Sequence, residues 1–444
     1  MSLHPSALTA HVHLIARLHP WYGKLLEEKR SSERGRLDYA DNREKTLLSL
    51  NELPLLNADL LARHYYAEPP RSEAGLSVYR TSGTSSGIRK SIYYSPEDDL
   101  HYIAAKQTSF EAWLNAKEKP MTADGESIET ASHSIVPKYG PIRRALADLG
   151  TGHAASTALS IFSSMGMEGE AISFSAPIEE HVAKLRTYRP ELLYTMPSLL
   201  ESIADAWPED EPFPVRKIIL VGEIASREWQ ANMAARLCLS PPDLLDTYGS
   251  IEVGAIAAYS HERNRYVLSE GMWGEGLTVQ ELGESFEPLA DNERVLVLTA
   301  MSRLMFPVVR FVTYDVVRDF EVTLIDGVPR GTFTGITKRI GSELKHGEKI
   351  SLYDIEAAVH LVLTDAAVRV AVNGNRLMLH IRSDQLAKHP EKLRHVRNEV
   401  EQRIPDIGMM IRGGLLKGID VIPVDAFRQL PGHGSVKGKK IYPS

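Results

Sequence analysis

Hydrophobic residues follow two different spacings along the chain, and each spacing predicts a different kind of element. Near the N-terminus, Leu8, Val12 and Ile15 recur at helical intervals until Pro20 interrupts the pattern. The densely charged residues 27–45 show no such period and predict a solvated loop. The chain is therefore expected to open with helical structure and to continue into a loop.

A later helix has a recognisable start. Ser95 can cap it, Pro96 suits the first helical position, and Asp98 lies where a capping box places an acid. The sequence therefore predicts a helix that begins at Pro96.

Residues 191–249 hold the clearest pattern, in which short apolar runs alternate with amphipathic segments. The runs ELLYT, VRKIILVG and LLDTYG are typical of buried strands, and helical periods fill the segments between them. Strand, helix, strand, helix and strand at this spacing predict a parallel sheet with right-handed crossovers. Ligands collect beyond the carboxyl ends of such strands, so the turns to search are residues 195–198, 222–226 and 248–252.

The pattern changes twice toward the C-terminus. After about residue 253, many short alternating runs predict an antiparallel subdomain. Beyond Gly335, a helical run, two strands around an Asn-Gly turn and a second helical run predict a small α+β domain. The predicted fold class is α/β, with a large N-terminal domain of parallel and antiparallel sheets at residues 1–335 and a small C-terminal domain at residues 336–444.

Composition narrows the functional classes. A chain of 444 residues exceeds one ordinary core, which supports the division into domains. A net charge of −7 gives no electrostatic footprint for nucleic acid, and no apolar run is long enough to cross a membrane. The single cysteine, Cys238, excludes an intrachain disulfide and indicates a reducing, cytoplasmic setting.

One candidate site is the segment TSGTSSGIRK, which does not have the spacing of a Walker loop. Its small residues let backbone N–H groups point at an anion, its hydroxyls add donors, and its lysine adds charge. A flexible surface turn explains the segment about equally well. The candidate phosphate-binding residues are Thr81, Ser82, Gly83, Thr84, Ser85, Ser86, Gly87 and Lys90.

Acidic residues near predicted strand ends are further candidates. In DTYGSIE, Glu252 follows a tight glycine turn, where a carboxylate can hold Mg²⁺ beside phosphates. In FPVVRFVTYD, Asp315 follows Arg310 and a buried-looking run, where an acid can take two ribose hydroxyls. Taken singly, a buried strand end and a surface ion pair are the commoner explanations. The histidines do not fall at metal-ligand spacings.

The order of these motifs is more specific than any one of them. A Thr-Ser-Gly-Thr-Ser loop with lysine precedes a Gly-Glu after a strand, an Asp-x-Tyr-Gly-x-x-Glu, an Arg-x4-Asp, a Gly-x-Lys-Ile segment and a Gly-Lys tail. In this order the chain resembles the adenylate-forming superfamily of acyl- and aryl-CoA synthetases, adenylation domains and luciferases. Its compact length and its opening residues are most similar to the phenylacetate-CoA ligase branch.

The resemblance implies a role for each matched residue. It implies that the loop grips the β- and γ-phosphates of ATP, that Glu252 holds Mg²⁺, and that Asp315 takes the ribose hydroxyls. It also implies that a tail lysine, Lys437 or Lys439, reaches the reacting carboxylate and the α-phosphate, delivered by a mobile C-terminal domain. The other implied ATP-binding residues are Gly222, Glu223, Asp246, Tyr248, Gly249, Ser250, Arg310, Lys338 and Arg339.

Departures from the family pattern leave alternatives open. The longer loop and the segment HGEKIS resemble the plant auxin-amido synthetases, which couple an acyl adenylate to an amine. The hinge lacks the usual Gly-Arg-x-Asp, so Lys338 and Arg339 are not ranked. In the tail, Lys437 fits the family count from Pro431, whereas Lys439 keeps the Gly-Lys pair. Cysteines that bind a structural zinc in some phenylacetate ligases are missing, so no zinc is expected.

The expected function is that of an ATP-dependent ligase that activates a carboxylic acid, by analogy an aryl acid, as an acyl-adenylate. Transfer to a thiol of CoA or of a carrier protein is the first expectation. Coupling to an amine is the alternative, and a catalytically silent nucleotide-binding or interaction protein on the same fold is another. Residues 132–144 and 150–152 are expected to line the acid pocket.

Overall fold

The computed structural model describes residues 5–34, 49–71, 75–81, 90–116, 141–149, 153–286, 288–341, 351–373, 375–414, 416–425 and 441–443. It opens with α1 (Pro5–Leu18) and α2 (Pro20–Arg34), which meet at the predicted break. The prediction of a loop was wrong for residues 27–34, which continue α2. Leu26 anchors this helix in a core with Leu53, while Glu27 and Glu28 on its other side are exposed.

The sheet at the centre of the molecule has the strand order β13-β14-β9-β8-β7-β6-β5-β3-β4. Its part from β4 to β7 is parallel, as predicted, and helices α5 to α8 connect the strands. The elements of this part are β3 (Arg144–Leu149), α5 (His153–Ser164), β4 (Glu168–Ser173), α6 (Ile178–Tyr188), β5 (Leu192–Thr195), α7 (Pro197–Ala206), β6 (Lys217–Val221), α8 (Arg227–Arg236) and β7 (Leu244–Ser250).

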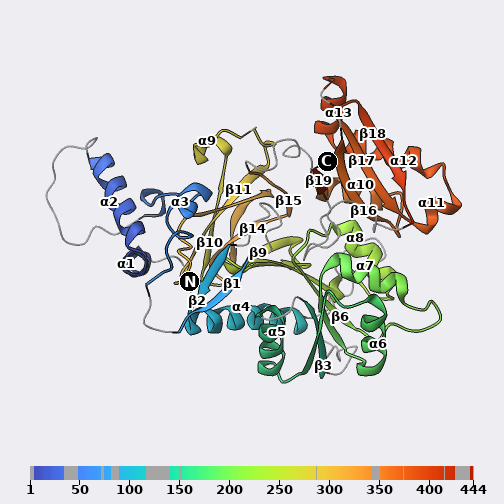
Figure 1. Cartoon of the computed structure of the whole chain (residues 1–444), viewed down its shortest axis with the longest axis horizontal. Helices are drawn as coiled ribbons and strands as arrows, with labels where there is room; N and C mark the ends of the chain where they lie inside the picture. Colours follow the sequence, from blue (N-terminus) through green and yellow to red (C-terminus); the bar gives the residue numbers. More distant parts are fainter. Residues whose placement is uncertain are drawn as a thin grey trace.

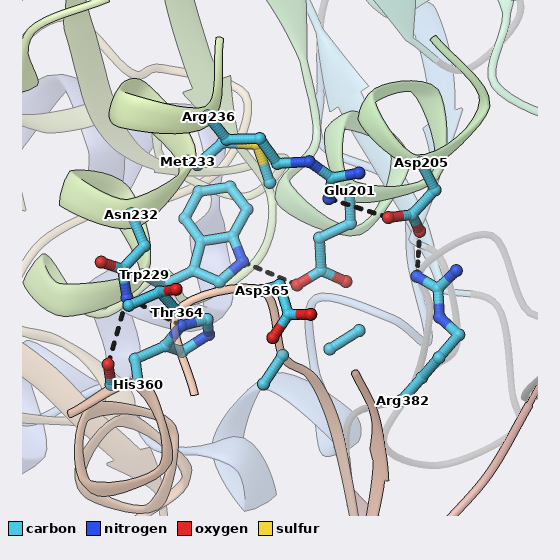
Figure 2. A pocket seen from close by; sticks show the side chains of 12 residues that line it. Glu201, Asp205, Trp229, Asn232, Met233, Arg236, His360, Thr364, Asp365 and Arg382 are labelled. Atoms are coloured by element: carbon cyan, nitrogen blue, oxygen red, sulfur yellow. Dashed lines mark hydrogen bonds and ion pairs between the residues drawn. The ribbon is translucent and has the colours of Figure 1, made fainter. Parts of the chain in front are cut away.

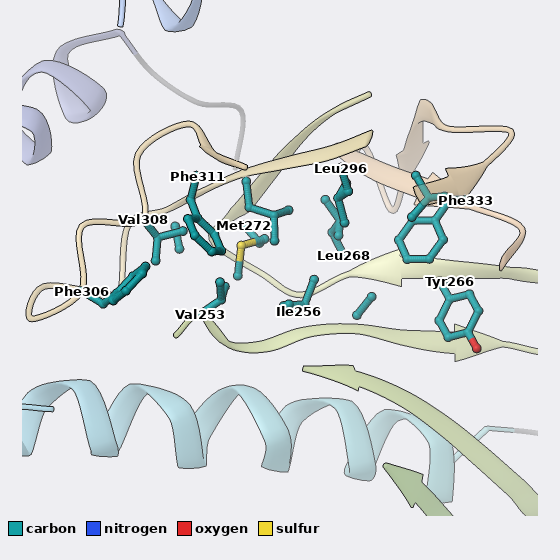
Figure 3. Packing of buried hydrophobic residues seen from close by; sticks show 14 of the residues in the cluster. Val253, Ile256, Tyr266, Leu268, Met272, Leu296, Phe306, Val308, Phe311 and Phe333 are labelled. Atoms are coloured by element: carbon teal, nitrogen blue, oxygen red, sulfur yellow. The ribbon is translucent and has the colours of Figure 1, made fainter. Parts of the chain in front are cut away.

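The other part of this sheet is antiparallel, and it packs against a second antiparallel sheet with the order β10-β11-β12-β15. Apolar side chains such as Ile256, Leu296 and Phe333 lie between the two sheets (Figure 3). The antiparallel prediction after residue 253 is confirmed. The elements are β8 (Gly254–Ser260), β9 (Arg265–Leu268), β10 (Met272–Leu277), α9 (Val279–Leu282), β11 (Glu293–Ala300), β12 (Phe311–Arg318), β13 (Glu321–Ile325), β14 (Val328–Phe333) and β15 (Gly335–Arg339).

After α3 (Ala58–Arg63), a hairpin of β1 (Ser77–Arg80) and β2 (Ser91–Tyr94) leads into α4 (Pro96–Leu114). The predicted capping box is present, because Ser95 and Asp98 each donate a backbone N–H to the other's side chain at 3.1 Å. The buried Asp98 carboxylate also accepts from Arg303 Nη1 at 2.6 Å. The start of α4 is therefore fixed both by its own cap and by the segment that follows β11.

The elements after residue 351 surround a core of their own, to which Val359 and Val396 belong. Figure 1 shows them as a distinct group beside the central sheet. They are α10 (Leu352–His360), β16 (Ala367–Asn373), β17 (Arg376–Arg382), α11 (Asp384–Lys388), α12 (Lys392–Arg403), α13 (Pro405–Arg412), β18 (Gly418–Pro423) and β19 (Ile441–Pro443). β16 pairs antiparallel with β17, as predicted.

Polar contacts join this C-terminal group to α7 and α8 (Figure 2). Asp205 of α7 accepts from Arg236 of α8 and from Arg382 of β17. The Ser226 N–H at the start of α8 donates to the buried Glu356 carboxylate of α10 at 2.8 Å. The C-terminal group thus rests on the helices that follow β5 and β6.

The observed architecture confirms the predicted α/β fold class. The domain boundary between residues 335 and 336 stays a prediction, and β15, which spans it, pairs with β12. In the described part of the chain, no helix combines the length and the apolar character that a membrane span requires.

Candidate active site

The predicted site residues converge on one cavity. It has a volume of about 960 Å³, and its walls include the turns that follow β5, β6 and β7, as expected for a parallel sheet. The predicted residues that line it are Thr81, Lys90, Gly222, Glu223, Asp246, Tyr248, Gly249, Ser250, Glu252, Asp315, Lys338 and Arg339.

Thr81 and Lys90 form the base of the predicted phosphate loop. The Thr81 N–H donates to the Lys90 carbonyl, and the Lys90 N–H donates to the Thr81 hydroxyl, both at 2.9 Å. These bonds extend the β1–β2 hairpin. Lys90 Nζ lies 4.9 Å from the centre of the Tyr66 ring, which also lines the cavity. The rest of the loop, with Ser82, Gly83, Thr84, Ser85, Ser86 and Gly87, lies outside the described residues.

The turn after β6 is held by its own carboxylate. Gly222 has a φ of 86°, a left-handed conformation that glycine adopts without strain. The two oxygens of Glu223 accept from the N–H and the hydroxyl of Ser198, each at 2.8 Å. Glu223 therefore ties the turn after β6 to the first turn of α7.

Asp246 is buried in β7 and accepts three hydrogen bonds on one oxygen. The donors are Arg227 Nη2 at 2.8 Å, Gln230 Nε2 at 2.9 Å and the Tyr266 hydroxyl at 2.5 Å. Burial raises the pKa of Asp246 above its ordinary value, while Arg227 acts in the opposite direction. Sequence analysis missed Arg227. Its position directly after Ser226, the last residue of one of the turns to search, was the available signal.

The turn between β7 and β8 needs glycine for steric reasons. A Cβ on Gly249 would lie 2.7 Å from the Gly254 carbonyl oxygen, closer than real Cβ contacts come. Gly254 itself has a φ of 96°. The Ser250 hydroxyl accepts from the Val253 N–H at 3.2 Å and so caps this turn.

Two long side chains hold the backbone on either side of Glu252. The Tyr94 hydroxyl donates to the Ile251 carbonyl at 2.7 Å, and Arg303 Nε donates to the Glu252 carbonyl at 3.1 Å. The Glu252 side chain is partly exposed and lines the cavity. Its backbone is therefore fixed while its carboxylate remains accessible.

Asp315 of β12 has two partners at the cavity wall. The Tyr248 hydroxyl donates to Asp315 Oδ2 at 2.5 Å, and Arg339 Nη1 lies 3.6 Å from Oδ1. Burial, together with the Asp315 carboxylate, raises the pKa of Tyr248 well above its ordinary value, so the phenol remains a donor. The Asp315 carboxylate also raises the pKa of Arg339, whose side chain is 54% exposed. The cluster presents an accessible cation beside a carboxylate.

Two predicted ATP-binding cations are engaged in the fold. Lys338 lines the cavity but is buried, with its Nζ 3.0 Å from Glu293 Oε2. Arg310 forms a two-pronged ion pair with Glu275 at 2.8 and 3.0 Å, and it does not line the cavity. The assignment of Arg310 to ATP binding is therefore corrected to a structural ion pair. Of the two hinge residues, Arg339 is the one beside Asp315.

Other predictions fall outside the described residues or away from the cavity. Lys437, Lys439 and residues 150–152 lie outside the described residues. Of the segment 132–144, residues 141–144 are described. They lead into the amino end of β3, opposite the strand ends that face the cavity, and they do not line it. For these four residues, the expectation that the segment lines the acid pocket does not hold for this cavity.

A less polar part of the cavity is lined by residues that the sequence analysis did not single out. Lys106 of α4 is 3% exposed, and its Nζ lies 3.4 Å from the Thr247 hydroxyl oxygen. Burial lowers the pKa of Lys106 to about 8. Its neighbours in the lining are Tyr102, Leu149, Ala154, Thr157, Ala158, Ile161, Tyr194 and Met196.

The acidic groups fit a metal ion that arrives with phosphates better than one held by protein alone. Among the described residues, no group of three or more His, Cys, Asp and Glu side chains comes together in a way that could hold a metal. Mg²⁺ is commonly bound through one or two carboxylates plus substrate phosphates. An accessible carboxylate such as Glu252 suits that kind of site.

Comparison with known proteins now decides the family. The chain is 33% identical over 412 residues to the fumarate–(S)-2,3-diaminopropanoate ligase of Enterobacter agglomerans, and the match covers 93% of each chain. The chain belongs to the family of this ligase. In addition, residues 345–426 match the family model described as the fumarate–diaminopropanoate ligase C-terminal domain.

Solved structures support the fold expected from the resemblance to the adenylate-forming superfamily. A 2-hydroxyisobutyryl-CoA ligase in the postadenylation state superposes with a TM-score of 0.68 at 15% identity, over 99% of this chain and 88% of that chain. The same ligase in the thioesterification state gives a TM-score of 0.54 at 14% identity, over 99% and 88%. The resemblance to this superfamily is confirmed at the level of fold, while the phenylacetate-CoA ligase branch stays a prediction.

The family corrects the expected function. The Enterobacter relative is named for joining a carboxylic acid, fumarate, to an amine-bearing amino acid. The expectation of an aryl acid passed to a thiol of CoA or a carrier protein is therefore wrong. The longer phosphate loop had already indicated the alternative, coupling to an amine.

Proposed function

We propose that this protein activates fumarate, or a closely similar acid, with ATP and joins it through an amide bond to an amine such as (S)-2,3-diaminopropanoate. The observation that carries the proposal is the 33% identity to the Enterobacter ligase, which extends over 93% of both chains. The cavity adds support, because all the described residues expected to contact ATP except Arg310 line it.

In the first half-reaction, a carboxylate oxygen attacks the α-phosphorus of ATP, and pyrophosphate leaves. Both reactants are anions, so cations must offset their repulsion and stabilise the charge of the transition state. Arg339 and Lys90, which line the cavity, would supply part of this charge, and Glu252 would hold Mg²⁺, which would supply more. Asp315 would accept the ribose hydroxyls and so fix the nucleotide.

In the second half-reaction, the amine nitrogen attacks the acyl carbon, loses a proton and displaces AMP. We propose that residues 336–444 act as a mobile domain that delivers Lys437 or Lys439 for adenylation and then withdraws it. Two half-reactions with different needs at one site give this movement its purpose.

The test combines two measurements on the full-length protein. Fumarate should start ATP–pyrophosphate exchange, and addition of (S)-2,3-diaminopropanoate should give an amide product by mass spectrometry with stoichiometric AMP. CoA in place of the amine should give no thioester. Exchange without fumarate dependence, or no amide with any amine tested, would contradict the proposal.

A further inference from the structure

The cations that line the cavity are not equivalent. Lys338 pairs with Glu293, and the more exposed Arg339 pairs with Asp315. Lys106 is as buried as any of them, yet among the described residues no carboxylate forms an ion pair with it. The cavity therefore contains a positive charge that the described fold leaves uncompensated.

The contacts that Lys106 does make are weak for an ammonium group. Its hydrogen bond to Thr247 is long, at 3.4 Å, and the Thr247 hydroxyl itself donates to the Leu220 carbonyl at 2.7 Å. The rings of Phe110 and Tyr194 lie 5.7 and 6.0 Å from Nζ. An ammonium has three donors, and burying it without an anion or further acceptors is unfavourable. A bound anion would remove this penalty.

The surroundings of Lys106 are otherwise neutral. Tyr102, one turn earlier on α4, and Tyr194 of β5 are its titratable neighbours in the lining, and burial raises the pKa of both phenols. They therefore stay uncharged in the pH range where the lysine changes its charge. An acid that entered this part of the cavity would meet apolar walls and one ammonium.

We propose that Lys106 binds the second carboxylate of a dicarboxylic acid, the one that is not activated. This inference rests on the proposed function and adds the residue that selects the acid. Fumarate carries its carboxylates on opposite sides of a trans double bond. With one carboxylate at the α-phosphate, the proposal requires the other to extend away from the nucleotide and to reach Lys106, which lines the same cavity. Monocarboxylic acids would leave the ammonium unpaired.

The experiment compares acids that differ only in the far group. Fumarate, monomethyl fumarate and fumaramic acid are measured by ATP–pyrophosphate exchange with wild-type enzyme and Lys106→Met. The wild type should prefer fumarate. Lys106→Met should lower kcat/KM for fumarate about tenfold to a hundredfold, the size expected for one charged hydrogen bond, and should leave the two neutral analogues within a few-fold.

Two further variants control for folding and charge. Lys184→Met removes a lysine on α6 that pairs with Glu170 away from the cavity. It should not change kcat/KM for any of the three acids. Lys106→Arg keeps the charge and should keep a preference for fumarate over its ester. The inference is overturned if Lys106→Met lowers kcat/KM equally for all three acids and Lys106→Arg also loses the preference for fumarate. That result would show that Lys106 acts only on the structure.

The outcomes also separate this inference from the proposed function. If wild-type enzyme makes the amide from fumarate but uses monomethyl fumarate equally well, the function stands and the role of Lys106 is wrong. If another dicarboxylic acid replaces fumarate and depends on Lys106, the inference stands and the proposed acid is wrong. Activation of monocarboxylic acids alone would overturn both.

Discussion

Two parts of the same cavity differ in whether their charged side chains have partners of opposite charge. Along β7, α8, β12 and β15, charged side chains have partners of opposite charge: Arg227 with Asp246, and Arg339 with Asp315. Lys106 of α4 instead contacts a hydroxyl group and two aromatic rings. Paired charges hold one another in place whether or not a ligand is bound, whereas an uncompensated charge gains most when the ligand supplies its partner.

The largest effect is expected from breaking the pair of Arg227 with the buried Asp246. Arg227→Met leaves the Asp246 carboxylate, 5% exposed, without its cation. We expect a loss on the order of 3 kcal/mol in the free energy of unfolding at pH 7. Because burial already raises the pKa of Asp246 above its unfolded value, the folded state binds that proton more tightly, and the deficit should shrink as pH falls. Urea unfolding at pH 7 and pH 5 measures both; a deficit that is constant with pH would contradict the assignment.

Removal of a paired charge at the nucleotide end should not depend on the acid. Asp315→Ala removes the proposed ribose ligand and leaves Arg339 unpaired. We expect kcat/KM for ATP to fall about tenfold to a hundredfold, by the same factor with fumarate and with monomethyl fumarate. Exposed Asp291 serves as the matched control in Asp291→Ala. A decrease in kcat/KM for ATP with only one of the two acids would contradict the proposed difference between the nucleotide end and the acid end of the cavity.

The charge of Lys106 should make the KM for fumarate depend on pH. Burial lowers the pKa of Lys106 to about 8, so the free enzyme loses this ammonium as pH rises through that value. The KM for fumarate in pyrophosphate exchange should rise toward about tenfold per pH unit above pH 8. The KM for ATP should not show this step, because Asp315 raises the pKa of Arg339. Lys106→Met should abolish the step for fumarate, and its persistence would assign it elsewhere.

The smallest effect is expected where pairing is exposed to solvent. Arg382 joins β17 to Asp205 of α7, and both side chains are roughly one-third exposed. Solvent screens such pairs, so Arg382→Ala should change the free energy of unfolding by less than about 1 kcal/mol. Urea unfolding of Arg382→Ala and Arg227→Met under the same conditions gives the comparison. An equal decrease in the free energy of unfolding for both variants would show that solvent exposure does not determine the effect.

Local pattern predicted much of this molecule. The parallel part of the sheet follows from apolar runs separated by helical periods, and the strand-end rule brought Glu223, Asp246 and Glu252 to one cavity. These features depend on neighbours within a few residues or on the general geometry of parallel sheets. The capping box at Ser95 is of the same kind.

What the sequence could not predict depends on distant partners. Arg310 looked like a site residue, but its carboxylate is Glu275, 35 residues earlier, on an adjacent part of the antiparallel sheet. Lys106 looked like an ordinary helix lysine, but its side chain is buried among distant partners that include Tyr194 of β5 and Thr247 of β7. A signal existed, since Ile103, Lys106 and Phe110 share one face of the helix at spacings of three and four. A lysine within such a stripe calls for a buried partner.

The attachment of α4 has a consequence for how this family can diversify. Lys106 lies on α4, whose start is held by the ion pair of Asp98 with Arg303, whereas the described residues proposed to contact ATP lie on other strands and turns. A substitution on the inward face of α4 would therefore change the part of the cavity that contains Lys106 without replacing a residue proposed to contact ATP. Selection can act on the choice of acid separately from the chemistry of adenylation, one helical turn at a time.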